Sequence, residues 1–382
     1  MLVLVLFACA GPIAAGAQTS PQFAPPPTPP TETPSSPPPS LPPAGEIDRT
    51  PALPSAAAKP KPKPKPVAAK SATRTNEDER TRGARLQTFL ARNGFSPGLI
   101  DGKPGAKTKV ALEDYKQAKG VDPTAAPTTS AEGGGGAGGG GGGDAAQPPA
   151  YAGNWTRSYR ITEADAALVT GPVPTDWNER AALSVCGYES LQELLSERGW
   201  CTQETVAWLN PSLTMSELKA GDEVVLPDVP DPLSVGSKAP GLPKLARVEV
   251  SLSGKVVRGF DDAEGTHQVC LMHCSIARLA EKRPAGELHV KVIATDPSYT
   301  FDPKDWPEVE GITQKLTIPP GPRNPVGSAW VGLDLPGYGM HGTVRPQDLG
   351  KTGSHGCFRM FNWDAVRLAR AVKVGTVVVV KE

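Results

Sequence analysis

The C-terminal part of the chain alternates apolar and polar positions in the way that half-buried strands do. After most of these strands, one helix is predicted at 363–372, with Asn362 as its N-cap. Together these elements predict a mainly β domain over residues 244–382, which is long enough to bury its own core. The predicted strands are 247–252, 255–257, 268–272, 287–294, 315–318 and 376–381, and the buried side of the helix would carry Val366, Leu368 and Ala369.

A second pattern, over residues 76–124, follows the helical period instead. Leu86, Phe89 and Leu90 recur at helical spacing, and a glycine- and proline-rich stretch at 94–102 then breaks the pattern. We therefore predict a small all-α unit of two helices. The second helix would carry Thr108 as its N-cap or in its first turn, and Val110, Leu112 and Tyr115 as apolar residues.

Residues 151–230 mix the two periods and predict a small α+β unit. Two helices are predicted, at 191–198 and 204–209, and Asn210 and Pro211 end the second of them. A glycine turn then leads into a short strand at 221–227. A first strand is predicted at 158–164.

The units are separated by segments that no apolar pattern organises. The chain contains 43 prolines and 41 glycines, both far above ordinary usage, and they are concentrated in these runs. We predict disordered linkers at 18–75, 125–150 and 231–243. The nearly pure glycine run in the second linker is expected to behave as flexible coil and to uncouple its neighbours.

The first residues predict an exported protein. An apolar stretch from Leu2 to Ala10 precedes Ala15-Gly16-Ala17, a small-residue cleavage signature, so we predict a signal peptide at 1–17. The alternative is a lipoprotein signal that anchors the chain at Cys9. Either reading places the protein in the periplasm or at the cell wall. The net charge is zero, from 40 basic and 40 acidic residues, so nothing favours nucleic acid as a partner.

The cysteines include two that could form a disulfide or stay free, and one that is expected to stay free. Cys186 and Cys201 could form a disulfide within the α+β unit, and Cys357 is the candidate free thiol. A separate cluster has side chains that suit zinc. Neighbouring strand residues point to opposite faces, so its members would diverge, and we predict no metal site and no cofactor. That cluster consists of His267, Cys270, His273 and Cys274.

The candidate chemistry lies in two short segments near the C-terminus, Met340-His341-Gly342-Thr343 and Ser354-His355-Gly356-Cys357-Phe358-Arg359-Met360. A thiolate is a strong nucleophile, and a neighbouring imidazole can lower the thiol pKa enough to form it at neutral pH. The glycine before the cysteine would let backbone approach a substrate carbonyl. The alternative is a buried structural cysteine among unrelated histidines.

These segments carry a family resemblance. With 324–327, Asn362 and 374–377, they resemble the YkuD-type L,D-transpeptidase catalytic domain. The helical unit resembles the peptidoglycan-binding-like domain, through Leu86-Gln87, Gly94-Phe95 and Pro97-Gly98 with Ile100-Asp101-Gly102. The α+β unit resembles LysM-like modules, which recognise N-acetylglucosamine polymers, through Leu209-Asn210-Pro211 and Pro227. This unit would either bind sugar or dock onto the catalytic domain. The implied fold is a multidomain chain whose mainly β catalytic domain follows these two small modules.

The resemblance implies a role for each residue of the candidate site. Cys357 would be the nucleophile and His341 the general base, with the Gly342 carbonyl holding the other ring N–H. Backbone N–H groups around Gly356 would stabilise the oxyanion, and His355 would shape the loop or polarise the sulfur. The remaining candidate substrate-binding residues are Arg359, which would orient a stem-peptide carboxylate or form a salt bridge, and Ser354 and Thr343, expected as hydrogen-bonding loop residues.

The implied activity is peptidoglycan cross-linking through a cysteine acyl-enzyme on tetrapeptide stems, with release of D-alanine. The alternatives are an L,D-carboxypeptidase of the same fold and a non-catalytic wall-binding protein. The implied partners are stem peptides and glycan strands, with an outer-membrane lipoprotein as a further candidate acceptor. The oligomeric state is left open.

Overall fold

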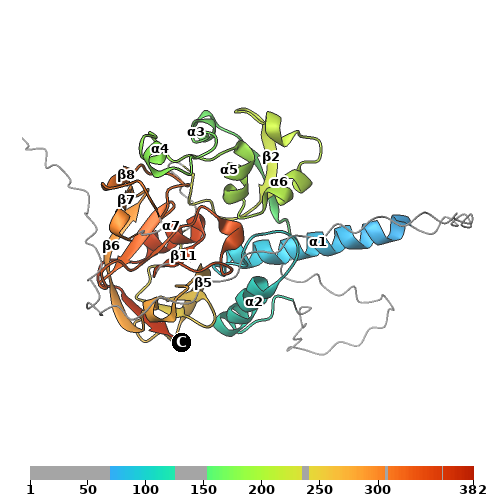
Figure 1. Ribbon diagram of the computed structural model, residues 1–382. Coiled ribbons are helices and arrows are strands. Elements are labelled where there is room, and N and C mark those ends of the chain that lie inside the picture. The colour runs from blue at the N-terminus through green and yellow to red at the C-terminus, as the bar shows by residue number, and fades with distance from the viewer. Residues whose placement is uncertain (1–68, 125–152, 235–240, 306–308, 355) are drawn as a thin grey trace, which may run out of the picture.

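The computed structural model describes residues 69–124, 153–234, 241–305, 309–354 and 356–382, with side chains from residue 79 onward (Figure 1). The predicted signal peptide, nearly all of the first two linkers and His355 lie outside the described residues. Within these ranges, no helix has the length and apolar character needed to cross a membrane.

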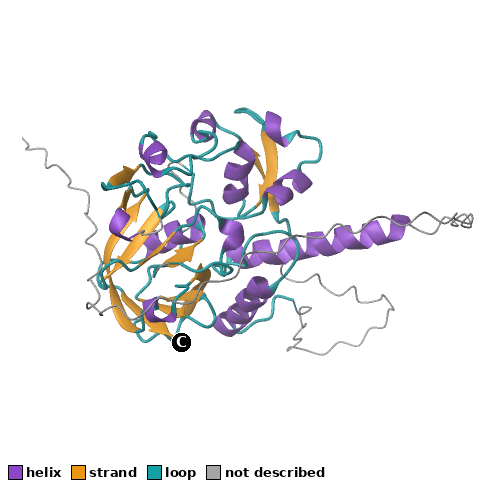
Figure 2. Ribbon diagram, viewed as in Figure 1, coloured by secondary structure: helices purple, strands orange, loops and turns teal. Residues whose placement is uncertain are grey.

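The C-terminal domain is a closed barrel whose strands run in the order β10-β11-β5-β4-β3-β12-β6-β9 (Figures 1 and 2). Most neighbours are antiparallel, but β12 is parallel to β3, and β10 is parallel to β11. Helix α7, Asn362–Ala371, packs against β9 and β6 with its apolar side in the core. The barrel strands are β3 Arg247–Ser251, β4 Val256–Phe260, β5 Gln268–Ser275, β6 Gly286–Thr295, β9 Ala329–Leu333, β10 Gly339–His341, β11 Phe358–Met360 and β12 Val377–Lys381.

The predicted mainly β domain is confirmed, and each predicted strand overlaps an observed one. Pattern analysis missed β9, β10 and β11, together with β7, Tyr299–Phe301, which pairs with β8, Leu316–Ile318, outside the barrel. The N-cap of α7 is Phe361, so the prediction of Asn362 at that position is wrong. Asn362 is the first helical residue, and its side chain bonds to other segments instead.

The helical unit consists of α1, Ala69–Arg92, and α2, Ala106–Lys119. Helix α1 begins inside the range predicted as linker. Gln87 joins the helices to the intervening turn, because its Oε1 accepts from Gly102 N at 2.9 Å and its Nε2 donates to Asp101 Oδ1 at 2.9 Å. Thr108 lies in the first turn of α2, where its hydroxyl donates to the carbonyl of Pro97 at 3.1 Å.

The α+β unit is built on two antiparallel strands, β1 Thr156–Arg160 and β2 Glu223–Pro227. Asn210 ties the end of α6 to β2, because its side chain accepts from Val225 N at 2.7 Å and donates to Val225 O at 2.9 Å. The other elements of this unit are α3 Glu163–Ala167, α4 Trp177–Ala181, α5 Leu191–Arg198, α6 Gln203–Leu209 and a 3₁₀ turn at Met215–Glu217. The C-terminal domain has further 3₁₀ turns at Ala280–Lys282, Pro303–Asp305 and Pro346–Asp348.

The two small units pack against the barrel and against each other (Figure 1), so the glycine-rich linker does not uncouple them, and of the two alternatives for the α+β unit the structure shows docking. Ser96 N donates to Leu271 O of β5 at 2.8 Å, and Phe95 is fully buried beside it. Ile100 N donates to Trp200 O at 2.8 Å, which joins the helical and α+β units. Apolar burial at these contacts outweighs the freedom that a glycine-rich tether provides.

The contact between the α+β unit and the barrel is aromatic at its centre. Trp200 stacks on Trp363 of α7 with ring centroids 5.7 Å apart, and Trp363 stacks on Phe361 at 4.6 Å. All three side chains are buried. Such pairs add to area burial, so this contact is a second apolar core, shared by the α+β unit and the start of α7, rather than a transient interface.

The structure contains no disulfide between Cys186 and Cys201, because both are free thiols in separate apolar clusters. Cys201 packs near Trp200, whereas Cys186 packs against Phe301. The disulfide alternative is therefore wrong for the described chain. Spacing within one unit does not bring two cysteines together when their segments face different neighbours.

Replacing Trp200 should destabilise the protein as a whole. Trp200→Ala removes a fully buried side chain, so we expect a loss of about 3–5 kcal/mol in the free energy of unfolding. Val225→Ala is the control, since Val225 is on the exposed side of β2 in the same unit. Urea denaturation followed by circular dichroism measures both. A loss confined to a separate early transition would contradict the shared core.

Candidate active site

The parallel pairing of β10 with β11 brings the two candidate segments together. His341 is the register partner of Arg359, and Met340 is the partner of Phe358. Cys357 directly precedes β11 and therefore lies at the same edge of the barrel as the glycine-rich approach to β10. The side chains of Met340, Phe358 and Met360 are fully buried, which anchors both strands in the core.

The thiol of Cys357 is partly buried and protonated in its resting state. Its Sγ donates to the carbonyl of Gly337 at 3.3 Å. Burial raises the pKa of the thiol to about 11, while the backbone of Gly339 and the charge of Arg359 act in the opposite direction. Burial therefore opposes a standing thiolate in the substrate-free site, and the charge of Arg359 favours one.

His341 is held as a neutral imidazole. Its Nδ1 lies 2.7 Å from the Gly342 carbonyl, so this nitrogen carries the proton and Nε2 keeps its lone pair. Burial lowers the pKa of the imidazole to about 4, which the backbone acceptors at Gly342 and Val326 oppose and the charge of Arg359 reinforces. The ring also stacks on Trp330 with centroids 5.7 Å apart.

The loop before β9 packs against the backbone of Gly342, whose carbonyl is bonded to His341. Asn324 is fully buried, and it donates to Pro319 O at 2.8 Å while accepting from Val326 N at 3.0 Å. Gly327 has φ +63°, a conformation that glycine adopts without strain. A Cβ there would lie 2.7 Å from the Cα of Gly342, so close approach of the two backbones depends on this glycine.

The residues around Cys357 hold the loop through their own hydrogen bonds. The Ser354 hydroxyl donates to the carbonyl of Cys357 and accepts from Gly356 N at 3.3 Å. The Thr343 hydroxyl accepts from Arg345 N at 3.2 Å. Ser354 and Thr343 therefore make loop bonds of the kind that the sequence led us to expect.

Tyr338 is a residue of the site that pattern analysis did not identify. It lies between two glycines just before β10, and a Cβ added at Gly356 would be 3.2 Å from its ring. Burial raises the pKa of Tyr338, and so does the nearby Cys357 sulfur. Its only signal in the sequence is an aromatic side chain in a glycine-rich approach to the histidine.

Arg359 is half-buried and points to the same side of β11 as Cys357, two residues earlier. Burial lowers the pKa of the guanidinium, and the Cys357 sulfur opposes this shift. Among the residues that the structure describes, no carboxylate forms an ion pair with Arg359.

The zinc-like residues do not converge. His267 is exposed and bonds to Asp261 through Nδ1 at 2.7 Å, whereas Cys270, His273 and Cys274 are buried in β5. Across the described ranges, no three histidine, cysteine or acidic side chains are grouped so that they could hold a metal ion.

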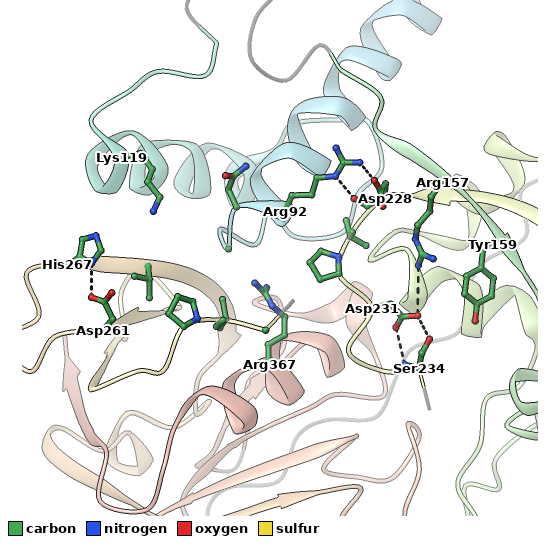
Figure 3. A pocket seen from close by; sticks show the side chains of 18 residues that line it. Arg92, Lys119, Arg157, Tyr159, Asp228, Asp231, Ser234, Asp261, His267 and Arg367 are labelled. Carbon is green, nitrogen blue, oxygen red and sulfur yellow. Dashed lines mark hydrogen bonds and ion pairs between the residues drawn. The ribbon is translucent and has the colours of Figure 1, made fainter. Parts of the chain in front are cut away.

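A cavity lies away from these residues, where the three units meet (Figure 3). It encloses about 820 Å³ and is lined from the helical unit by Arg92, from the α+β unit by Arg157 and from the barrel by Arg367. None of the predicted site residues lines it. This cavity is therefore separate from the candidate reactive centre, which contains Cys357 and His341.

The reactivity of Cys357 should depend on pH in a characteristic way. Because its pKa is raised to about 11, the thiolate fraction should rise about tenfold per pH unit between pH 6 and 9. The alkylation rate by iodoacetamide, read at Cys357 by peptide mass mapping, should follow that slope. A rate that reaches a plateau below pH 7 would instead show a standing thiolate and contradict the neutral pair.

Comparison with known proteins agrees with this geometry. Residues 246–380 match the family model described as "YkuD: L,D-transpeptidase catalytic domain". "Putative L,D-transpeptidase YkuD" of Bacillus licheniformis is 26% identical over 175 residues, which cover 46% of this chain and 84% of that protein. "Putative L,D-transpeptidase YqjB" of Bacillus subtilis is 37% identical over 105 residues, or 26% of this chain and 52% of that protein.

Among solved structures, L,D-transpeptidase 3 from Mycobacterium tuberculosis, in complex with a faropenem-derived adduct, is similar with a TM-score of 0.29 and 20% identity. The match covers 44% of this chain and 76% of that one. The family match spans all strands of the barrel and both candidate segments. Residues 246–380 are therefore similar to the L,D-transpeptidase catalytic domain of the YkuD family.

Proposed function

We propose that this protein is a peptidoglycan L,D-transpeptidase that uses Cys357 as its nucleophile and His341 as its general base. The observation that carries the proposal is the tautomer of His341. Because Nδ1 is bonded to the Gly342 carbonyl, Nε2 is the nitrogen left to accept a proton. The parallel pairing of β10 and β11 places this base one strand away from the cysteine segment.

The reaction begins from a neutral thiol and a neutral imidazole. The Cys357 sulfur attacks the carbonyl between the third residue and the terminal D-alanine of a tetrapeptide stem, and its proton passes to Nε2 of His341. The resting pKa values oppose transfer of this proton before the substrate arrives. Proton transfer therefore accompanies formation of the carbon–sulfur bond, and general-base catalysis of this kind contributes roughly 10²–10⁴-fold.

The tetrahedral intermediate then collapses to a thioester. The bond to D-alanine breaks, and its nitrogen takes the proton back from His341, so the imidazole is neutral again. The N–H of Gly356 bonds to Ser354 at 3.3 Å, a long bond that a developing oxyanion can replace. An acceptor amine next attacks the thioester, giving a cross-link and regenerating the Cys357 thiol. Attack by water would give the carboxypeptidase outcome.

Arg359 would position the substrate. Its guanidinium lies beside the sulfur and has no described acidic partner, so a stem-peptide carboxylate can pair with it. Such a pair would place the scissile carbonyl relative to Cys357. Proximity of this kind accounts for a large share of catalysis in two-substrate reactions.

The accessory units would bring the catalytic domain to polymeric substrate. Their folds hold the motifs that resemble peptidoglycan-binding-like and LysM-like modules, through Gln87 and Asn210 among others. We propose glycan strands as their ligand and export to the periplasm or cell wall as their setting, with an outer-membrane lipoprotein as a further candidate acceptor. Docking onto the barrel would then place glycan binding and peptide chemistry on one rigid body.

The products formed from a defined muropeptide test this proposal. The full chain is incubated with a disaccharide-tetrapeptide and followed by mass spectrometry. Cross-linked dimer with release of D-alanine is the expected result, and Cys357→Ala should abolish it. Cys270→Ala is the matched control, because it removes a buried thiol on β5. Loss of D-alanine without dimer would establish the hydrolase, and an unchanged substrate mass would refute both enzyme functions.

The Cys357 thiol should also open the strained β-lactam ring of a carbapenem. A carbapenem presents a β-lactam carbonyl, which Cys357 can attack in the way proposed for the stem peptide. We expect the intact mass of the protein to increase by one carbapenem, and His341→Gln to slow this acylation by about 10²-fold or more. An adduct that persists in Cys357→Ala, or none in the unaltered protein, would count against an activated Cys357.

A further inference from the structure

Glu197 of α5 is a buried carboxylate that the mechanism above does not use. It is 5% exposed, and both of its oxygens accept from Asn362 Nδ2, at 3.0 and 3.2 Å. Oε2 also accepts from the Tyr188 hydroxyl at 2.9 Å. An acidic group from the α+β unit thus reaches the first residue of α7, in the catalytic domain.

Asn362 continues this contact toward the active site. Its Oδ1 accepts from Ser328 N at 3.2 Å, while its Nδ2 also donates to Pro322 O at 3.2 Å. A Cβ added at Gly342 would lie only 2.1 Å from Oδ1, so the amide oxygen is in close contact with that residue. The Gly342 carbonyl is the acceptor that holds Nδ1 of His341.

The carboxylate is one of three groups that fix which way the Asn362 amide faces. The ionised carboxylate and the Pro322 carbonyl only accept hydrogen bonds, so they hold the NH₂ end of the amide, while Ser328 N donates to its oxygen. Without Glu197, the NH₂ group would keep only the Pro322 carbonyl as an acceptor, and the amide could shift toward it. The packing of Asn362 against Gly342 would then change, and with it the hydrogen bond between Nδ1 of His341 and the Gly342 carbonyl.

The groups around Glu197 favour a buried polar contact between the α+β unit and α7. Burial raises the pKa of its carboxyl to about 7, and Glu193 acts in the same direction. The hydrogen bonds from Tyr188 and Asn362, and the charge of Arg198, oppose the shift. A buried carboxyl of this kind destabilises the fold unless its partners are well placed, and here each oxygen has donors.

We propose that Glu197 is a positioning residue for His341, acting through Asn362 and the Gly342 carbonyl, so that the α+β unit completes the catalytic site. The activity assay rests on the proposed function, whereas the state of the His341 ring does not. The unit therefore has a role in catalysis apart from any glycan that it binds.

Two substitutions of similar size separate this role from packing. Glu197→Leu removes the acceptor, and we expect kcat to fall about tenfold or more with KM within about twofold, since small misplacements of a base are costly. Glu197→Gln keeps one acceptor oxygen and should restore most of kcat. If Glu197→Leu does not fold, Glu197→Asp, which withdraws the carboxylate by one methylene, should show an intermediate loss.

The matched control is Glu193→Gln on the same helix. Glu193 pairs with Arg323 from the catalytic domain, and within the described residues it forms no hydrogen bond with Asn362, so it tests docking together with its charge effect on Glu197. We expect Glu193→Gln to keep kcat within about twofold. A loss as large as that of Glu197→Leu would overturn the proposal in favour of general docking.

The ¹⁵N chemical shifts of the His341 imidazole give a readout that needs no substrate. The unaltered protein should show a single Nδ1–H tautomer, and Glu197→Leu a mixture of tautomers. An unchanged tautomer in Glu197→Leu would overturn the proposal even if activity fell. If the unaltered protein shows the single tautomer but turns over no muropeptide, the proposed function fails. The ¹⁵N shifts of His341 in Glu197→Leu would still test the positioning role.

Discussion

The parallel pairing of β10 with β11 is the contact on which the candidate chemistry depends. These short strands complete the barrel between β9 and β5, and each has buried side chains that fix its depth. That register sets His341 beside Arg359 and brings Cys357 to the edge of the same strands. The buried position then makes both groups neutral, because charge is costly away from water.

The barrel does not stand alone. Two small units, separated from each other in the chain by a glycine-rich linker, dock on it through Phe95, Trp200 and their neighbours. The stacked pair of Trp200 and Trp363 extends the core across the boundary, and Glu197 reaches from the same side to Asn362. Apolar burial holds the units together, and one polar link within it leads toward the reactive histidine.

Local patterns predicted much of this structure. Strands such as β3 and β12 alternate buried and half-exposed positions, so their period was visible. Strand β9 is buried at every position, and β10 and β11 have three residues each, so pairing with distant segments defines them. The Cys357 and His341 motif was recognisable, but the thiol pKa was not, since burial arises only from tertiary packing. Glu197 had no local signal because it lies 165 residues from Asn362.

The central claim is that Cys357 forms a thioester with the donor stem. The full chain is mixed with a disaccharide-tetrapeptide, quenched in acid within one turnover, and digested for peptide mass mapping. We expect the peptide containing Cys357 to gain the mass of the donor without its terminal D-alanine, and hydroxylamine to release this group. An adduct on another residue, or product formation with no adduct during the first turnover, would contradict it.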